Sequence, residues 1–160
     1  ATKLVVDVRG NPGGYLEASV DIASWFLPTG RIVVTEDYGG NEDNIVHRSR
    51  GYDVFNENLK MVILVDRGSA SASEILAGAL RHWGVAKLVG VNTFGKGSVQ
   101  ELVPITESTG LKITVARWVG PVGVPIPNEG IKPDVEVKIT EEDAKAKKDV
   151  QMEKALELLN

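Results

Sequence analysis

Apolar runs and amphipathic segments alternate along the first part of this 160-residue chain. Short runs of aliphatic and β-branched residues predict buried strands at residues 4–8, 61–65 and 86–91. Between these runs, apolar residues recur at helical spacing in residues 16–27 and 73–83, which predicts two amphipathic helices. The pattern therefore predicts strands that alternate with helices.

The second part of the chain is dominated by strand-like patterns. Alternating apolar and polar residues predict strands at 99–105, 111–119 and 135–139, whereas the proline- and glycine-rich stretch 120–133 is expected to be extended or turning. Thr140, followed by three acidic residues, predicts the capped start of one last helix. Its apolar face would be formed by Met152, Ala155, Leu156 and Leu159. These patterns predict an α/β chain with a β-rich second half.

One strand and one long polar stretch lie between the first helix and the central apolar run. Residues 31–36 predict a strand. The polar residues 37–58 predict either a surface loop, which could act as a mobile flap, or an irregular hairpin with a short strand at 44–48.

Composition and charge exclude several classes of protein. With 42% hydrophobic and 25% charged residues, the chain is typical of one soluble globular domain. Its net charge of −4 gives no reason to expect nucleic acid or an anionic membrane as partner. The absence of cysteine excludes disulfides and thiol catalysis, and two histidines exclude a multi-histidine metal site within this sequence. Because the chain leads from Ala1 almost directly into a strand, we expect it to be a piece of a longer protein.

Residues 68–74 (Gly-Ser-Ala-Ser-Ala-Ser-Glu) join a predicted strand to a predicted helix. A helix N-terminus has unpaired N–H groups and a favourable dipole, so a serine there can act as a nucleophile beside a ready oxyanion site. The same residues also form a capping-box pattern, Ser71-x-x-Glu74. Both interpretations are compatible if Ser73 caps the helix while Ser71 projects from the turn.

Two familiar chemistries fit these residues poorly. A Ser-His-Asp hydrolase would need a histidine near Ser71, but His82 follows on the same helix, roughly 16 Å away at 1.5 Å per residue. His47 precedes the serine in a polar stretch, so both histidines are interpreted as structural or surface residues. Residues 90–97 match the P-loop pattern G-x-x-x-x-G-K, but Gly97 stands where Ser or Thr belongs and a strand pattern follows.

A serine–lysine hydrolase is the third possibility. A lysine can act as a general base where burial disfavours its ammonium form. Lys96 lies between Gly95 and Gly97, so the backbone there can closely approach another element of the fold.

Four segments together resemble the C-terminal processing peptidases, also called tail-specific proteases. They are 6–14 (Val-Asp-Val-Arg-Gly-Asn-Pro-Gly-Gly), 65–80, 93–100 (Thr-Phe-Gly-Lys-Gly-Ser-Val-Gln) and 130–134. Members of this family are serine endopeptidases with a Ser–Lys dyad, often extended by a Gln. The resemblance implies a fold similar to the Clp protease and crotonase folds, with mixed sheets, packed helices and a β-rich second half.

The resemblance also implies the site residues. The family's nucleophile corresponds to Ser71, its general base to Lys96 and its lysine-orienting glutamine to Gln100. Positions 96 and 100 would lie roughly 13 Å apart in an extended strand, so their contact requires a bend or a helical turn between them, which Gly97 permits. The oxyanion donors would be the N–H of Ala72 and that of Gly13, with the neighbouring Gly14 as second choice.

The resemblance further implies substrates, partners and location. Substrates would be proteins or peptides with exposed C-termini, bound as an added strand, with neither metal nor other cofactor and no nucleic acid. A homo-oligomer or a regulatory partner and an extracytoplasmic location (periplasmic, cell-envelope or lumenal) are expected. The PDZ domain usual in this family has no counterpart in the sequence, so residues 1–160 would be a single, truncated protease core.

The alternative is a non-catalytic peptide- or lipid-binding module of the same fold, because the fold family includes relatives that resemble retinoid-binding modules of the photoreceptor matrix. The intact set of Ser71, Lys96 and Gln100 favours the enzyme.

Overall fold

A computed structural model describes residues 1–52, 54–55 and 58–160, and its first sheet is parallel throughout. Its strands lie in the order β1-β4-β5-β8. They are β1 (Lys3–Asp7), β4 (Lys60–Val65), β5 (Ala86–Gly90) and β8 (Val135–Glu136). The three strands predicted from the apolar runs are thus confirmed; β4 and β5 are buried, whereas β1, at the edge of the sheet, is only half-buried. The helices between them provide the crossovers that parallel strands require.

The second sheet is antiparallel, with the strand order β3-β2-β7-β6. Its strands are β2 (Ile32–Asp37), β3 (Ile45–Arg48), β6 (Ser98–Pro104) and β7 (Gly110–Val119). The short strand considered at 44–48 is therefore present as β3 and pairs with β2. Of the polar stretch 37–58, residues 53, 56 and 57 lie outside the described residues.

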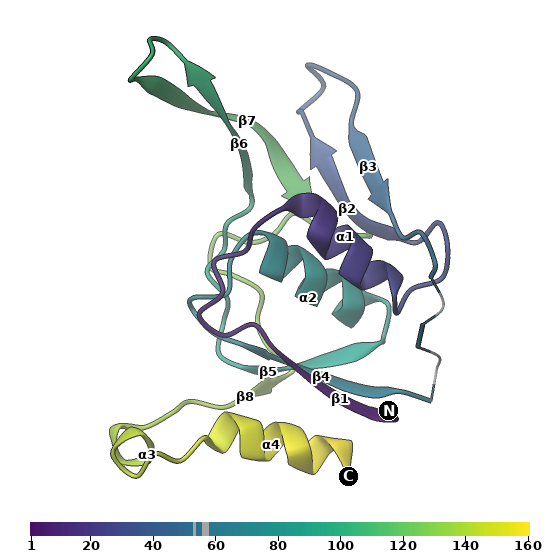
Figure 1. Cartoon of the computed structure of the whole chain (residues 1–160), viewed down its shortest axis with the longest axis vertical. Helices are drawn as coiled ribbons and strands as arrows, with labels where there is room; N and C mark the ends of the chain where they lie inside the picture. The colour runs from purple at the N-terminus through teal and green to yellow at the C-terminus, as the bar shows by residue number, and fades with distance from the viewer. Residues whose placement is uncertain (53, 56–57) are drawn as a thin grey trace.

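The helices and sheets form layers, as Figure 1 shows. Helices α1 (Leu16–Ser24) and α2 (Ala72–His82) pack side by side between the two sheets, and α4 (Val150–Leu159) covers the other face of the parallel sheet. None of the helices in the described part of the chain combines the length and apolar composition needed to cross a membrane.

The single helix predicted after Thr140 is wrong, because two helices form there. Thr140 does cap α3 (Glu141–Lys145), accepting from the Asp143 N–H, but Lys147 has a left-handed backbone (φ +55°) that ends the helix. Asp149 then caps α4 through the Met152 N–H. On α4, Met152, Ala155 and Leu159 pack on the sheet as predicted.

The prediction that Leu156 belongs to the buried apolar face of this helix is wrong, since the residue is 52% exposed. Ala155 and Leu159 lie one turn apart on the face that meets the sheet, and Leu156 lies on its flank.

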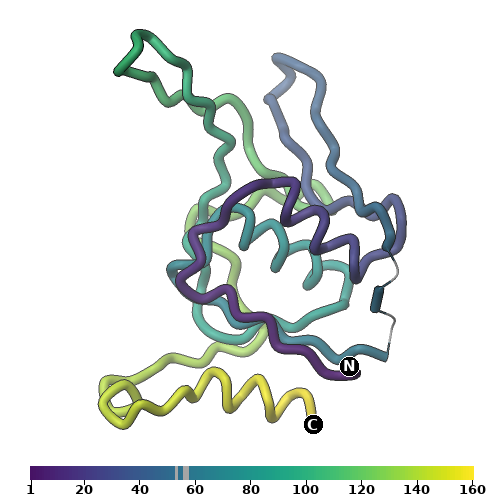
Figure 2. The backbone as a smooth tube through the Cα atoms, in the orientation of Figure 1, coloured from purple at the N-terminus to yellow at the C-terminus, as the bar shows by residue number. Residues whose placement is uncertain are grey.

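The hairpin of β6 and β7 extends away from the body of the molecule (Figures 1 and 2). We call residues 98–116 of this hairpin the arm. Strand β7 pairs with β2 only where Arg117–Val119 face Thr35–Asp37, so the rest of β7 pairs with β6 alone. The arm is therefore held mainly by its own ladder.

Candidate active site

Ser71 lies in a sharp turn between β4 and α2, where it is the N-cap residue and is half-buried. Its backbone has φ +54° and ψ −119°, a combination that residues other than glycine rarely adopt. Such strain costs on the order of 1–3 kcal/mol and is concentrated at functional sites. The strand–turn–helix geometry is that of a nucleophile elbow.

The carboxylate of Glu74 joins this turn to the loop that carries Lys96. Glu74 is fully buried, and its Oε2 accepts hydrogen bonds from the N–H groups of Ser71 (3.0 Å) and Lys96 (2.9 Å). Its Oε1 accepts from the Gly95 N–H (2.8 Å) and from the Thr93 hydroxyl (2.5 Å). The backbones of Ser71 and Lys96 are therefore held at one carboxylate oxygen.

The buried Thr93 and the glycine Gly95 also fix the loop that carries Lys96. The Thr93 hydroxyl accepts from the Ile131 N–H (2.7 Å) while it donates to Glu74. Gly95 has φ +94°, and a Cβ there would lie 2.1 Å from the Asn128 carbonyl oxygen. The predicted close approach of this loop to another element is confirmed, because the backbone of the 120–133 stretch lies directly against it.

The turn after β1 lies against the turn that carries Ser71, as the predicted oxyanion site requires. The Asn11 carbonyl accepts from the Ala70 N–H (3.0 Å) and from the Ser73 hydroxyl (3.2 Å). Gly13 has φ +94°, and a Cβ there would lie 2.8 Å from the Ala72 nitrogen. The Gly13 N–H donates to Asn11 Oδ1 (2.9 Å).

The prediction that Ser73 caps the helix is wrong. Ser71 is the N-cap residue, with its N–H bound to Glu74 as in a capping box. Ser73 lies within the first turn of α2, and its hydroxyl holds the Asn11 carbonyl instead. Spacing alone could not separate these two roles, because both serines precede apolar helical positions.

Gln100 and the side chain of Lys96 are not joined to the rest of the site by hydrogen bonds in this structure. Among the described residues, Lys96 Nζ makes no hydrogen bond with Ser71 Oγ or with Gln100. Gln100 is exposed on β6, and its amide donates to Thr114 Oγ1 at 3.5 Å. A shift in register between Val99 and Gln100 supplies an irregularity in this strand. The contacts of Lys96 with Ser71 and with Gln100 stay predictions.

The two disfavoured chemistries find no support in the geometry. His47 lies on β3 and contacts Glu36 (2.7 Å), while His82 ends α2, far along the helix from Ser71. Strand β5 is followed by a loop and β6, so no helix N-terminus follows the P-loop-like residues 90–97. Within residues 1–52, 54–55 and 58–160, no three His, Asp or Glu side chains gather in a way that could hold a metal ion.

Asp66 organises the backbone around the site, and two further acidic residues bind the nearby Arg9. Asp66 Oδ1 accepts from the N–H groups of Gly10 (2.8 Å) and Gly68 (2.8 Å), which ties the turn after β1 to the turn that leads to Ser71. Side-chain hydrogen bonds from Arg9 lower the pKa of Asp149 to about 2 and lower the pKa of Asp7. The sequence pattern predicted neither the role of Asp66 nor the contact of Asp149 with Arg9.

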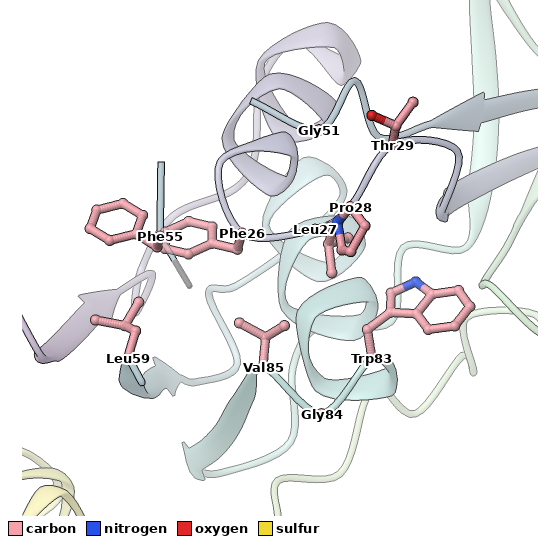
Figure 3. A pocket seen from close by; sticks show the side chains of 10 residues that line it. All are labelled: Phe26, Leu27, Pro28, Thr29, Gly51, Phe55, Leu59, Trp83, Gly84 and Val85. Atoms are coloured by element: carbon pink, nitrogen blue, oxygen red, sulfur yellow. The ribbon is translucent and has the colours of Figure 1, made fainter. Parts of the chain in front are cut away.

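A cavity of about 630 Å³ lies at the other end of α2 from Ser71. Figure 3 shows Phe26 and Phe55 on one side of it and Trp83 on another. The two phenylalanine rings are stacked, with centroids 4.9 Å apart. Its walls contain none of the predicted catalytic residues.

Comparison with known proteins matches this arrangement to one family. The profile described as Peptidase family S41 matches residues 1–137. The chain is 39% identical over 158 residues to a carboxyl-terminal-processing protease of Synechocystis sp., and 39% identical over 140 residues to the carboxy-terminal processing protease CtpB of Bacillus subtilis. These alignments cover 97% and 84% of this chain but only 36% and 28% of the two relatives.

A solved structure titled photosystem II D1 C-terminal processing protease superimposes on the chain with a TM-score of 0.76 at 36% identity. The superposition covers 91% of this chain and 37% of that one. The predicted fold class is confirmed, since the mixed α/β arrangement of this chain is that of a solved protease of the predicted kind.

Proposed function

Because the chain belongs to peptidase family S41, we propose that it forms the catalytic core of a serine endopeptidase that cleaves near protein C-termini. In this proposal Ser71 is the nucleophile and Lys96 the general base. The names of the relatives, which are carboxyl-terminal processing proteases, support this choice of substrate.

The observation that carries the proposal is the shared carboxylate of Glu74. One oxygen of this buried side chain accepts from the N–H groups of both Ser71 and Lys96. Residues 25 positions apart in the chain (96 − 71) are thereby fixed within two hydrogen-bond lengths of one another. A flexible lysine side chain attached at this point can turn toward the serine hydroxyl.

The reaction would proceed through an acyl-enzyme. Ser71 Oγ attacks the scissile carbonyl carbon, and its proton passes to the neutral Lys96 amine. The tetrahedral intermediate collapses when Lys96 returns the proton to the leaving amine, and the peptide bond breaks. Water then attacks the ester with Lys96 again as base, which releases the new C-terminus and restores Ser71. Gln100 would hold the lysine once its amide turns from Thr114.

The oxyanion would be bound by two backbone donors. As the first residue of α2, Ala72 has an N–H with no acceptor inside the helix. The second donor comes from the turn at Gly13 and Gly14. The Gly13 N–H must first release Asn11 Oδ1, whereas the Gly14 N–H meets no acceptor among the described residues. The geometry therefore favours Gly14 as the donor while Gly13 provides the close approach.

Substrate chains would bind as an added strand and present their C-termini to Ser71, without a metal or another cofactor. We place the protein outside the cytoplasm, in an envelope or lumenal compartment. The name of one relative, a C-terminal processing peptidase of Tetradesmus obliquus described as chloroplastic, is compatible with a lumenal location. A second copy or a regulatory protein is a further expected partner.

Removal of either reactive side chain tests the proposal. Ser71→Ala and Lys96→Ala should each abolish peptide cleavage while circular dichroism stays unchanged. Ser108→Ala and Lys87→Ala are matched controls, because both residues are exposed and lie away from the site. Cleavage that persists in either site variant would contradict the assignment.

The alternative function is a non-catalytic binding module of the same fold. A serine-reactive acylating probe separates the two, because an enzyme should be labelled at Ser71 and the label should be lost in Lys96→Ala. Absence of labelling at Ser71 would favour the binding module, whereas labelling that persists in Lys96→Ala would contradict Lys96 as the general base.

A further inference from the structure

All N–H groups of the Arg9 guanidinium are hydrogen-bonded, and they join the end of β1 to the start of α4. Arg9 precedes the turn at Gly13 and Gly14, which we call the oxyanion turn. Its Nε and Nη2 donate to the Asp7 carboxylate (3.0 and 2.7 Å), and Nη1 and Nη2 donate to the Asp149 carboxylate (2.9 and 2.8 Å). The Nη1 group also donates to Gln151 Oε1 (3.0 Å). Two-point contacts of this kind fix direction as well as distance. Only 17% of the Arg9 side chain is exposed.

The residues that hold Arg9 from α4 are themselves fixed. Asp149 caps α4 by accepting from the Met152 N–H (2.9 Å). Gln151 is buried, and its amide donates to the Val137 carbonyl (2.8 Å). Ala155 and Leu159, further along the helix, pack on the face of the parallel sheet. The helix therefore offers Arg9 a rigid attachment.

A short path of hydrogen-bonded residues leads from Arg9 to Gly13, which precedes the favoured oxyanion donor Gly14. The next residue, Gly10, donates its N–H to Asp66 (2.8 Å), and the Asn11 carbonyl accepts from the Ala70 N–H (3.0 Å). The Asn11 side chain then holds the Gly13 N–H. A shift of the Arg9 backbone would thus be transmitted over four residues to the turn that faces Ala72.

The contact of Arg9 with α4 joins the part of the chain that matches the family profile to a part that lies outside the match. The match ends at residue 137, so both Asp149 and Gln151 lie beyond the part of the chain that defines the family. They nevertheless contact a residue of the matched segment 6–14, directly before the proposed oxyanion turn.

We propose that α4 is a positioning element for the active site, and that Asp149 sets the oxyanion turn through Arg9. The proposal rests on the proposed peptidase function. Asp149 touches no reacting atom, so its effect would appear in the chemical step rather than in substrate binding. When α4 detaches, the turn at Gly13 and Gly14 loosens and catalysis falls.

The test compares two substitutions that each remove one negative charge from the start of α4. Asp149→Asn keeps the helix cap but replaces one oxygen by an NH₂ group that faces Arg9. Glu153→Gln is the matched control, because Glu153 pairs with Lys148 (3.3 Å) and does not contact Arg9. Peptide kcat and KM, the rate of probe labelling and Tm are measured for both.

We expect Asp149→Asn to lower kcat and the labelling rate by about tenfold or more, since small misplacements of catalytic groups have effects of this size. KM should change less than about twofold, and Glu153→Gln should behave as wild type in every assay. If Asp149→Asn does not fold, Asp149→Ser, which also caps helices, replaces it.

A wild-type kcat in the Asp149 variant, with or without a lower Tm, would overturn the role of α4 and leave only a stabilising ion pair. Cleavage that survives in Ser71→Ala would instead overturn the proposed function. The two failures are therefore distinguishable.

Discussion

The carboxyl ends of strands β4 and β5, with the turns that follow them, form a region that we call the edge. The edge and the arm meet at residues 96–98, but they are built in opposite ways. At the edge, Glu74, Ser69 and Thr93 are all fully buried, and their side chains hold backbone from distant parts of the chain. On the arm, Leu102 is 72% exposed and Ile105 is 64% exposed. The ladder between β6 and β7 supplies most of the arm's contacts.

This difference shows that the structure is more tightly constrained at the edge than on the arm. A buried polar group that loses its partner costs free energy, so the edge can occupy only one arrangement without penalty. A two-stranded hairpin alone is marginally stable in water, so the arm tolerates change. We therefore expect substitutions at the edge to affect both stability and catalysis, and substitutions on the arm to affect stability little.

The largest contrast is expected between two Glu→Gln substitutions. Glu74→Gln replaces one carboxylate oxygen by an NH₂ group that faces N–H donors, so at least two buried donors lose their acceptor. At about 1–3 kcal/mol for each of the two orphaned groups, the free energy of unfolding should fall by about 2–6 kcal/mol. Urea denaturation measures this change.

Glu101→Gln on the arm is the control for this substitution. Glu101 is exposed, so its replacement should change the free energy of unfolding by less than about 0.5 kcal/mol. Similar losses in the two variants would show that the contrast between edge and arm is false.

Of the contacts of Glu74, the sequence could predict the local one but not the long-range one. The pattern Ser-x-x-Glu predicted its contact with the Ser71 N–H, because that contact is local to one helix turn. Its contact with the Lys96 N–H joins two segments 22 residues apart, and no periodicity encodes such a contact. The resemblance to a family supplied the two residues proposed to react, but it did not supply the carboxylate that brings their backbones together.

The fold shows the same division. Apolar runs and helical spacing predicted the buried strands and both central helices, because burial on a regular element leaves a period in the sequence. The break at Lys147 and the exposed position of Leu156 were missed, since each depends on how α4 docks on the sheet. The direction of the arm was also beyond prediction, as its strands pair locally wherever it points.

Gly13→Ala should have the next largest effect. The substitution would force an L residue to φ +94° and place its Cβ 2.6 Å from the Ala70 carbonyl oxygen and 2.8 Å from the Ala72 nitrogen. We expect a loss of about 1–3 kcal/mol in the free energy of unfolding. We also expect a drop in kcat of about a hundredfold or more, because an oxyanion donor would be obstructed.

Gly14→Ala serves as the stability control for this substitution. A Cβ at Gly14 meets nothing within 4 Å, so the free energy of unfolding should stay within about 0.5 kcal/mol of wild type. Equal destabilisation by both alanines would mean that the turn does not pack on the nucleophile as closely as the structure indicates.

The smallest effect is expected at the partly exposed ion pair between Arg9 and Asp149. Side-chain hydrogen bonds from Arg9 lower the pKa of Asp149 to about 2, below the value of about 4 typical of an unfolded chain. A carboxyl whose folded pKa is depressed stabilises the fold above its unfolded pKa, and this stabilisation is lost as the pH falls through the folded pKa.

The difference in Tm between wild type and Asp149→Asn should therefore be constant from pH 7 to about 5 and shrink as the pH falls toward 2. Because 44% of the Asp149 side chain is exposed, 0.5 M salt should reduce this difference as well. A difference that changes with neither pH nor salt would mean that the charge of Asp149 does not stabilise its contact with Arg9, so that this contact is not held as an ion pair.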